Sequence, residues 1–168
     1  RIEEPMGRNT YLTRNIWGEV EAVRQTGSQG GVFRDVTQSF AYDAQRRVCR
    51  SYTPEGGATL YDYDAAGQMI AYAKGQPNNG CTVPANSPDR VDLYYDDLGR
   101  LERTDFYDPN TPDIFRDYDD NSNLTHINRG VLFETVDWAY TYDELNNLKT
   151  ENLQLDGQSF SLAYQYNP

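Results

Sequence analysis

The chain has 168 residues, with 15 Lys or Arg against 26 Asp or Glu, so its formal net charge is -11 at pH 7. This acidic balance and the lack of a basic run exclude nucleic-acid binding and disfavour an anionic membrane surface, because both need clustered Lys and Arg. No apolar run approaches the roughly 20 residues that span a bilayer, and the 14 Tyr, 6 Phe and 2 Trp are rings that suit a sheet better than a helical core.

A Tyr-Asp dipeptide recurs along the chain and predicts a series of similar structural units. The first unit, residues 14–20, is an eroded copy in which Arg14 replaces the Tyr. The later copies are Tyr42-Asp43, Tyr63-Asp64, Tyr95-Asp96, Tyr118-Asp119, Tyr142-Asp143 and a degenerate Tyr166-Asn167. An aliphatic residue follows each Tyr of the five intact copies at a fixed distance: Val48, Met69, Leu101, Leu124 and Leu148.

Each dipeptide opens a predicted hairpin turn. The Asp carboxylate can accept backbone N–H bonds, and Gly67 or Gly99, three residues after the Asp, can take the positive φ that a tight turn needs. The other copies carry Arg46, Ser122 and Asn146 at this position. Because Arg and Ser tolerate left-handed geometry less easily than Asn, looser turns are expected there.

The segments beside the turns alternate with a period of two, which predicts strands. Aromatic residues occupy every second position in 138–142. Residues 160–166 show the same alternation, with Leu162 at one of the positions. The pairs Phe40/Tyr42, Tyr61/Tyr63 and Leu93/Tyr95 are also two residues apart. Residues 26–31 and 75–90 are rich in Gly, Ser, Asn or Pro and are expected to form loops. No segment has helical periodicity.

A single hairpin of this kind is too small to be stable. Ordering one repeat costs roughly 36 kcal/mol, whereas two Tyr and one aliphatic side chain return about 10 to 15 kcal/mol. The repeats must therefore stack edge to edge. The predicted fold is all-β: tandem β-hairpins in a continuous, spiralling antiparallel sheet, with residues 1–168 as one array of about six to seven repeats interrupted by the insertion 75–90.

The repeat pattern Tyr-x-Tyr-Asp-x-x-Gly-Arg-Leu resembles the YD or RHS repeat family. It is intact but for its first Tyr over 93–101, and residues 61–69 are similarly close. The resemblance implies a sheet that winds into an arc of a hollow shell, in a β-solenoid-like array. Bacterial RHS toxin shells and Tc toxin C-type shells enclose a toxic domain, and teneurins carry a similar YD shell on the cell surface for adhesion.

The sequence does not support catalysis or a cofactor. Shells of this family often cleave themselves at Asp-Pro-x-Gly motifs, but no Gly follows Asp108-Pro109 at the required place. His126 lies at an ordinary repeat position, and no Gly-x-Ser-x-Gly elbow accompanies it. Residues 117–123 alternate oxygen ligands as a calcium loop does, but Ser122 replaces the Gly and Asn128 the bidentate Glu. We therefore assign no catalytic, cofactor-binding or metal-binding residues.

Cys49 and Cys81 are too few for a metal cluster or a disulfide framework. They are either one disulfide, which would tie the insertion to an earlier strand, or two separate thiols. The resemblance to a secreted family favours the disulfide.

These observations predict a non-enzymatic segment of a secreted or surface-displayed bacterial shell that encloses a cargo or toxin domain. The alternative is an extracellular adhesion or filament-forming module that associates through sheet edges and binds glycans on its aromatic rings. The expected partners are neighbouring repeats or copies of the chain, an enclosed polypeptide or surface glycans, with no nucleic acid and no membrane insertion.

Overall fold

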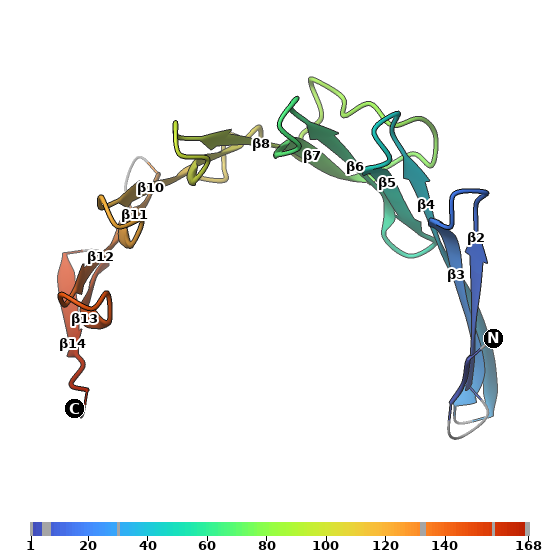
Figure 1. The fold of residues 1–168 in the computed structure, drawn as a ribbon, viewed down its shortest axis with the longest axis horizontal. Helices are drawn as coiled ribbons and strands as arrows, with labels where there is room; N and C mark the ends of the chain where they lie inside the picture. The colour runs from blue at the N-terminus through green and yellow to red at the C-terminus, as the bar shows by residue number, and fades with distance from the viewer. Residues whose placement is uncertain (1, 5–7, 30, 132–133, 156, 167–168) are drawn as a thin grey trace. The chain divides into compact units, whose positions relative to one another are not determined.

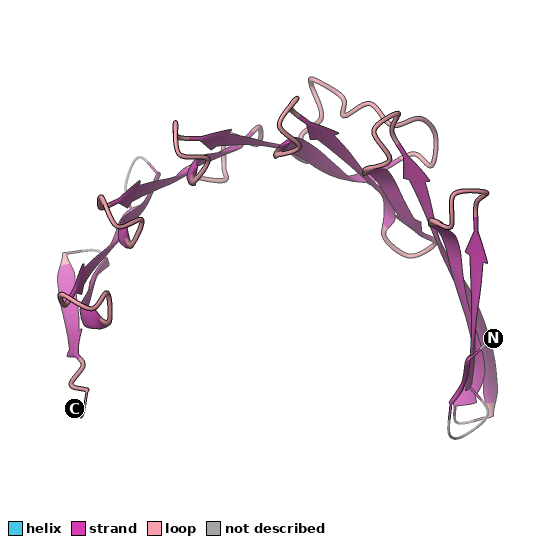
Figure 2. Ribbon diagram, viewed as in Figure 1, coloured by secondary structure: helices cyan, strands magenta, loops and turns pink. Residues whose placement is uncertain are grey.

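The computed structural model describes residues 2–4, 8–29, 31–131, 134–155 and 157–166, and shows strands joined by turns and one long loop (Figure 1). The described residues contain no helix, as the colouring of Figure 2 makes plain. Accordingly, none of them belongs to a helix that could cross a membrane. The prediction of an all-β fold built from tandem antiparallel hairpins is confirmed.

The chain packs as two compact units, Arg1–Arg90 and Val91–Pro168. Within each unit, strands that follow one another in the sequence pair antiparallel and lie side by side in chain order (Figure 1). The first unit contains β1 (Ile2–Glu4), β2 (Arg8–Arg14), β3 (Val20–Gln29), β4 (Val32–Tyr42), β5 (Val48–Thr53), β6 (Gly57–Tyr63) and β7 (Met69–Gln76). The strands of the second are β8 (Arg90–Tyr95), β9 (Leu101–Phe106), β10 (Ile114–Tyr118), β11 (Leu124–Val131), β12 (Glu134–Tyr142), β13 (Leu148–Leu155) and β14 (Gln158–Ala163).

A register shift follows every repeat turn. In the β4–β5 hairpin, for example, Tyr42 lies opposite Val48 but Ala41 lies opposite Arg50, so Cys49 has no partner across the ladder. The same shift places one extra residue in β3, β7, β9, β11 and β13. Such β-bulges bend the strand and increase its twist. The recurring unit is therefore a hairpin with a bulge directly after its turn.

The structure corrects the prediction that residues 26–31 form a loop. β3 continues to Gln29, and Thr26 pairs with Asp35, Gly27 with Arg34 and Ser28 with Phe33. The Gly and Ser content indicated a loop from local preference, but cross-strand backbone bonds to β4 outweigh that preference. The second predicted loop is shorter than expected, because β7 extends to Gln76 before the insertion begins.

The first unit has a small buried core beneath the insertion. Val83, from the insertion, is 4% exposed and packs against strands β6 and β7. The other members of this core are Ala58, Leu60, Ala71 and Ala73, with Tyr52 packed at its margin. A single sheet leaves apolar side chains half exposed, so this cluster depends on the loop that covers it.

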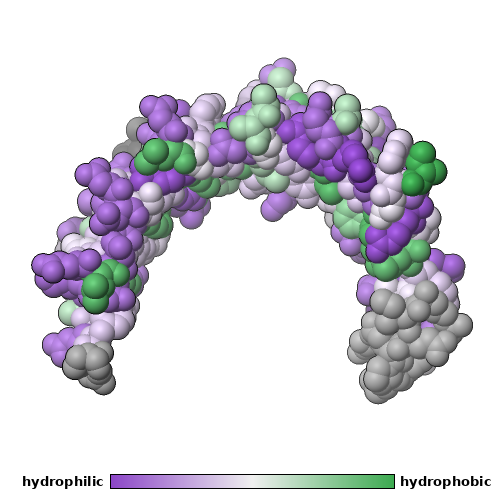
Figure 3. All heavy atoms as spheres, viewed as in Figure 1, coloured by the Kyte–Doolittle hydropathy of each residue, from purple (hydrophilic) through white to green (hydrophobic). Residues whose placement is uncertain are grey.

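The last strands of the second unit have one apolar face and one polar face. Ile127, Trp138, Leu153 and Phe160 are successive cross-strand partners from β11 to β14, and partners directly opposite share a face of the sheet. The neighbouring row on the other face consists of Asn128, Asp137, Gln154 and Ser159. Phe160 is 57% and Leu162 60% exposed. Figure 3 shows hydrophobic patches among hydrophilic side chains on the visible face.

We expect Leu60→Ala to lower the free energy of unfolding by about 2 to 4 kcal/mol, because it leaves a cavity in the core beneath the insertion. Leu98→Ala is the matched control, since Leu98 lies on a turn and is 70% exposed; it should change stability by less than about 0.5 kcal/mol. Urea unfolding monitored by circular dichroism measures both. Equal losses in the two variants would contradict a core at this place.

Candidate functional site

The Tyr-Asp turns share one hydrogen-bonded geometry. In each, the Asp N–H donates to the carbonyl four residues later, and the N–H three residues later donates to the Asp carbonyl, at 2.8 to 3.2 Å. The Asp Oδ1 also accepts backbone N–H bonds: those of Gln45 and Arg47 at Asp43, and that of Gln68 at Asp64. The carboxylate therefore substitutes for backbone partners inside the turn.

The eroded first copy closes in the same way although it has no Asp. The Oδ1 atom of Asn15 accepts the N–H groups of Trp17 and Glu19, both at 3.0 Å. Gly18 takes the positive φ that the turn requires. A side-chain oxygen at this position, rather than a negative charge, is thus what the turn needs.

The expectation of looser turns at Arg46 and Ser122 is wrong. Arg46, Ser122 and Asn146 adopt φ values of 65°, 67° and 62°, and each donates its N–H to the turn Asp at 3.0 Å. These turns are as closed as those with Gly67 and Gly99. The Asp bonds and the pairing of the flanking strands offset the cost of left-handed geometry in a non-glycine residue.

In five places a tyrosine hydroxyl joins a hairpin to the preceding hairpin of the same unit. The Tyr63 hydroxyl donates to the Val48 carbonyl at 2.8 Å, and the Tyr118 hydroxyl donates to the Leu101 carbonyl at 2.9 Å. The same bond runs from Tyr42 to Val20, from Tyr142 to Leu124 and from Tyr166 to Leu148. Every acceptor is the first residue of a strand and lies beside the bulge, where the backbone ladder is interrupted.

Two arginines strengthen this joint in a second way. Arg100 Nε donates to Asp96 Oδ2 at 2.6 Å, its Nη1 donates to the Asp119 carbonyl at 3.0 Å, and its guanidinium lies 4.7 Å from the centre of the Tyr118 ring. Arg47 makes the equivalent contacts with Asp43, Asp64 and Tyr63 in the first unit. Each of these guanidinium groups therefore contacts its own turn, the next turn and the tyrosine between them.

Asparagine replaces arginine at the corresponding place in the later turns. Asn123 Nδ2 donates to Asp119 Oδ2 at 3.0 Å and to Asn146 Oδ1 of the next turn at 2.8 Å. Asn147 Nδ2 likewise donates to Asp143 Oδ2. The sequence analysis missed the role of these positions, although Arg100 in the Gly-Arg-Leu part of the motif was a signal for it.

The turn bonds lower the pKa values of four turn carboxyls, those of Asp43, Asp96, Asp119 and Asp143. Backbone N–H donation from Arg100 is the main cause at Asp96, and side-chain donation by Asn123 and Asn147 is the main cause at Asp119 and Asp143. At Asp43, desolvation acts to raise the pKa, but the bonds from Arg47 outweigh it and the net shift is downward. In each case the bonds favour the ionised form.

The residues that the sequence analysis weighed for catalysis or metal binding lie in the strands and turns of the repeats. His126 lies exposed on β11, between Asp117 and Ala139 of the neighbouring strands. Asp119 is the turn carboxylate already described, and no group of three metal-ligating side chains occurs among the residues that the structure describes. The Asp108 carboxylate accepts bonds from Asn110 and Thr111 in the β9–β10 turn.

Cys49 and Cys81 are joined by a disulfide with a Cα–Cα distance of 5.2 Å. This bond links the bulge of β5 to the insertion between β7 and β8. Arg50 Nη1 donates to the Gly80 carbonyl beside it at 3.2 Å.

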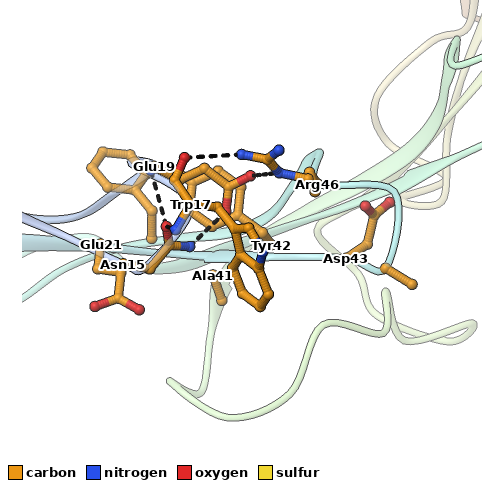
Figure 4. Close-up of a pocket in the computed structure, with 10 residues that line it drawn as sticks. Asn15, Trp17, Glu19, Glu21, Ala41, Tyr42, Asp43 and Arg46 are labelled. Atoms are coloured by element: carbon orange, nitrogen blue, oxygen red, sulfur yellow. Dashed lines mark hydrogen bonds and ion pairs between the residues drawn. The ribbon is translucent and has the colours of Figure 1, made fainter.

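A hollow of about 580 Å³ lies beside the first two turns. Figure 4 shows Glu19 between Asn15 and Arg46, with a hydrogen bond or ion pair to each. Trp17 is 64% exposed at its rim. The full lining is Asn15, Trp17, Glu19, Glu21, Phe40, Ala41, Tyr42, Asp43, Ala44 and Arg46. Aromatic rings thus lie beside polar side chains in this open hollow.

No protein-family model matches the chain, and no curated protein matches it by sequence. Solved structures do match. A crystal structure of TcdB2-TccC3 is similar over 87% of this chain and 8% of that chain, with a TM-score of 0.69 and 16% identity. TcdB2-TccC3-Cdc42 matches 87% of this chain and 8% of that chain, with a TM-score of 0.67 and 17% identity.

A third structure, the Photorhabdus luminescens Tc holotoxin pore, matches over 88% of this chain and 7% of that chain, with a TM-score of 0.63 and 18% identity. The chain thus spans less than a tenth of the length of these proteins. At these identities the likeness shows the fold alone. That fold is the repeat sheet of the TcdB2-TccC3 type.

We expect Tyr118→Phe to lower the free energy of unfolding by about 1 to 2 kcal/mol, because it leaves the Leu101 carbonyl without its hydroxyl donor. The ring contact with Arg100 is retained. Tyr94→Phe is the control, since the Tyr94 side chain is 48% exposed. Denaturant midpoints report both variants. A loss in Tyr94→Phe as large as in Tyr118→Phe would argue against the role of the hydroxyl.

We expect stability to fall in acid. The folded pKa values of Asp96, Asp119 and Asp143 lie below those of the unfolded chain. Their contribution is therefore present above about pH 4 and is lost as the pH falls through the folded values. Asp143→Asn should keep the turn closed, as Asn15 does, but weaken the pH dependence. Urea unfolding midpoints measured from neutral pH to acid test this. If the midpoint of Asp143→Asn fell with pH as steeply as that of the unsubstituted chain, the assignment would be contradicted.

Proposed function

We propose that this chain is a structural, non-enzymatic segment of a secreted or surface-displayed RHS-type shell that encloses a polypeptide cargo. In this proposal, residues 1–168 form one array of repeats and the insertion interrupts it. The observation that carries the proposal is the two-sided sheet of β11–β14. Its apolar face has no covering layer among the described residues, and its other face is polar.

In a shell whose wall is a single sheet, one face meets the cargo and the other meets solvent, so an apolar and a polar face are both needed. Continuous backbone pairing closes the wall to water and proteases, because it leaves few unpaired groups between strands. The apolar face gives a partly unfolded cargo a surface of weak, nonspecific contacts without forming a packed core with it. The likeness to TcdB2-TccC3 supports this proposal through the shared fold. The acidic charge of the chain favours solubility of the other face.

Binding of an unfolded polypeptide tests this function. A fluorescein-labelled, disulfide-free and chemically unfolded polypeptide should bind the full chain and raise its fluorescence anisotropy. The double variant Phe160→Ser/Leu162→Ser should bind about tenfold more weakly, because it removes two exposed side chains of the apolar face. The control Ser159→Ala/Ser161→Ala changes the other face of the same strand and should bind normally. Absence of binding, or an equal loss in both variants, would overturn the proposal.

The second candidate function is an adhesion or filament module. In this candidate the chain associates with other chains through its sheet edges, because an unpaired strand edge is a template for another strand. Trp17 at the rim of the hollow offers a ring for glycans, as sugars stack on exposed aromatic faces. Sedimentation velocity over a wide concentration range distinguishes the candidates: concentration-dependent polymers support the filament, and a constant monomer supports the shell segment.

A further inference from the structure

The insertion, residues 77–89, lies over a floor that is shaped for it. Val83 is 4% exposed against Ala58, Leu60, Ala71 and Ala73. The positions of Ala71 and Ala73 are occupied in the other intact repeats by larger pairs: Arg50/Tyr52, Arg103/Asp105, His126/Asn128 and Thr150/Asn152. Alanine at both positions occurs in the one repeat that the insertion covers, so the small side chains make room for Val83.

The disulfide lies at a bulge position that is exposed in four other hairpins and half-buried in a fifth, where it is Thr125. Cys49 is the extra residue of the β5 bulge and is 2% exposed. The residues at the same place in four other hairpins, Glu21, Ile70, Glu102 and Lys149, are exposed. Burial of Cys49 is therefore a consequence of the covering insertion and not of the repeat itself.

Polar contacts also tie the insertion to the strands on either side of it. Gln76 Nε2 donates to Ser87 Oγ at 3.0 Å, Arg50 Nη1 donates to the Gly80 carbonyl at 3.2 Å, and Arg90 Nη1 donates to the Val83 carbonyl at 3.4 Å. The buried side chains Val83 and Ser87 and bonds of this kind contribute less free energy than the entropy cost of ordering residues 77–89, which contain no strand. The covalent bond supplies the remaining restraint.

We propose that the insertion is a thiol-sensitive strap, which covers the alanine floor while Cys49 and Cys81 are bonded and leaves it when a dithiol reduces them. A thiolate of the dithiol attacks the sulfur of Cys81, which is more accessible than Cys49. The S–S bond breaks, a mixed disulfide forms at Cys81, and Cys49 leaves as a thiolate that takes up a proton.

The second thiol of the dithiol then displaces the sulfur of Cys81, which leaves as a thiolate and also takes up a proton. The protein disulfide gains two electrons and two protons, and the dithiol is oxidised to a disulfide. Release of the strap exposes Leu60 and the three alanines to solvent or to a partner. This device does not depend on what the sheet encloses.

Hydrogen exchange of the full chain tests the strap. After reduction with dithiothreitol, amides in 79–87 and in β6–β7 should exchange about tenfold faster or more, whereas those of β12 and β13 in the second unit should not change. The double variant Cys49→Ser/Cys81→Ser should exchange as the reduced chain does, with or without dithiothreitol. Ser87→Ala, which keeps the disulfide but loses the bond to Gln76, should stay protected until it is reduced.

Two outcomes would overturn the proposal. Unchanged protection of 79–87 after reduction would mean that Val83 and the side-chain bonds hold the insertion without the disulfide. Loss of protection throughout the chain would mean that the Cys49–Cys81 disulfide stabilises the whole protein and not the insertion alone. The direction of attack has its own readout: brief treatment with glutathione followed by peptide mapping should place the adduct on Cys81, and an adduct on Cys49 would contradict the route.

Discussion

The bond from a tyrosine hydroxyl to a main-chain carbonyl of the preceding hairpin is the contact on which the rest of this structure depends. A hairpin of this size cannot bury enough apolar area to be stable alone. The hydroxyl reaches the strand start beside the bulge, where the backbone ladder is interrupted, and fixes the register between successive hairpins. Tyrosine alone among the aromatic residues offers both a large ring and a hydroxyl at its tip.

The turns add a second set of bonds between successive hairpins. A carboxylate or amide oxygen closes each turn, and an Arg or Asn of that turn reaches the next one. Arg100 adds a charge and a ring contact, whereas Asn123 adds an amide bond alone. Because both use an ionised Asp, the joints at Asp96, Asp119 and Asp143 weaken together in acid.

A sheet without a second layer has to solve a packing problem in each unit. In β11–β14 the apolar side chains remain partly exposed on one face, and this is the surface that the proposed cargo would contact. In β5–β7 the chain covers its own face with the insertion and locks it with a disulfide. Strands β11–β14 thus present an open apolar face, and β5–β7 present a covered one that, in our proposal, a dithiol uncovers. The difference follows from a single insertion in one repeat.

The sequence by itself determined the repeat, the strand periodicity and the turns, because these are local: Tyr-Asp spacing, alternation of rings and a side-chain oxygen at the start of each turn are visible in the residues. It misjudged Arg46, Ser122 and the segment 26–29, since turn closure and cross-strand pairing there override local preference. The acceptors of the tyrosine hydroxyls, the reach of Arg47 and Arg100 to the next turn, the alanine floor beneath Val83 and the apolar row from Ile127 to Phe160 were decided by tertiary structure. Each of these features depends on which atoms of different hairpins come into contact. The strand register, with its bulge after every turn, determines those contacts.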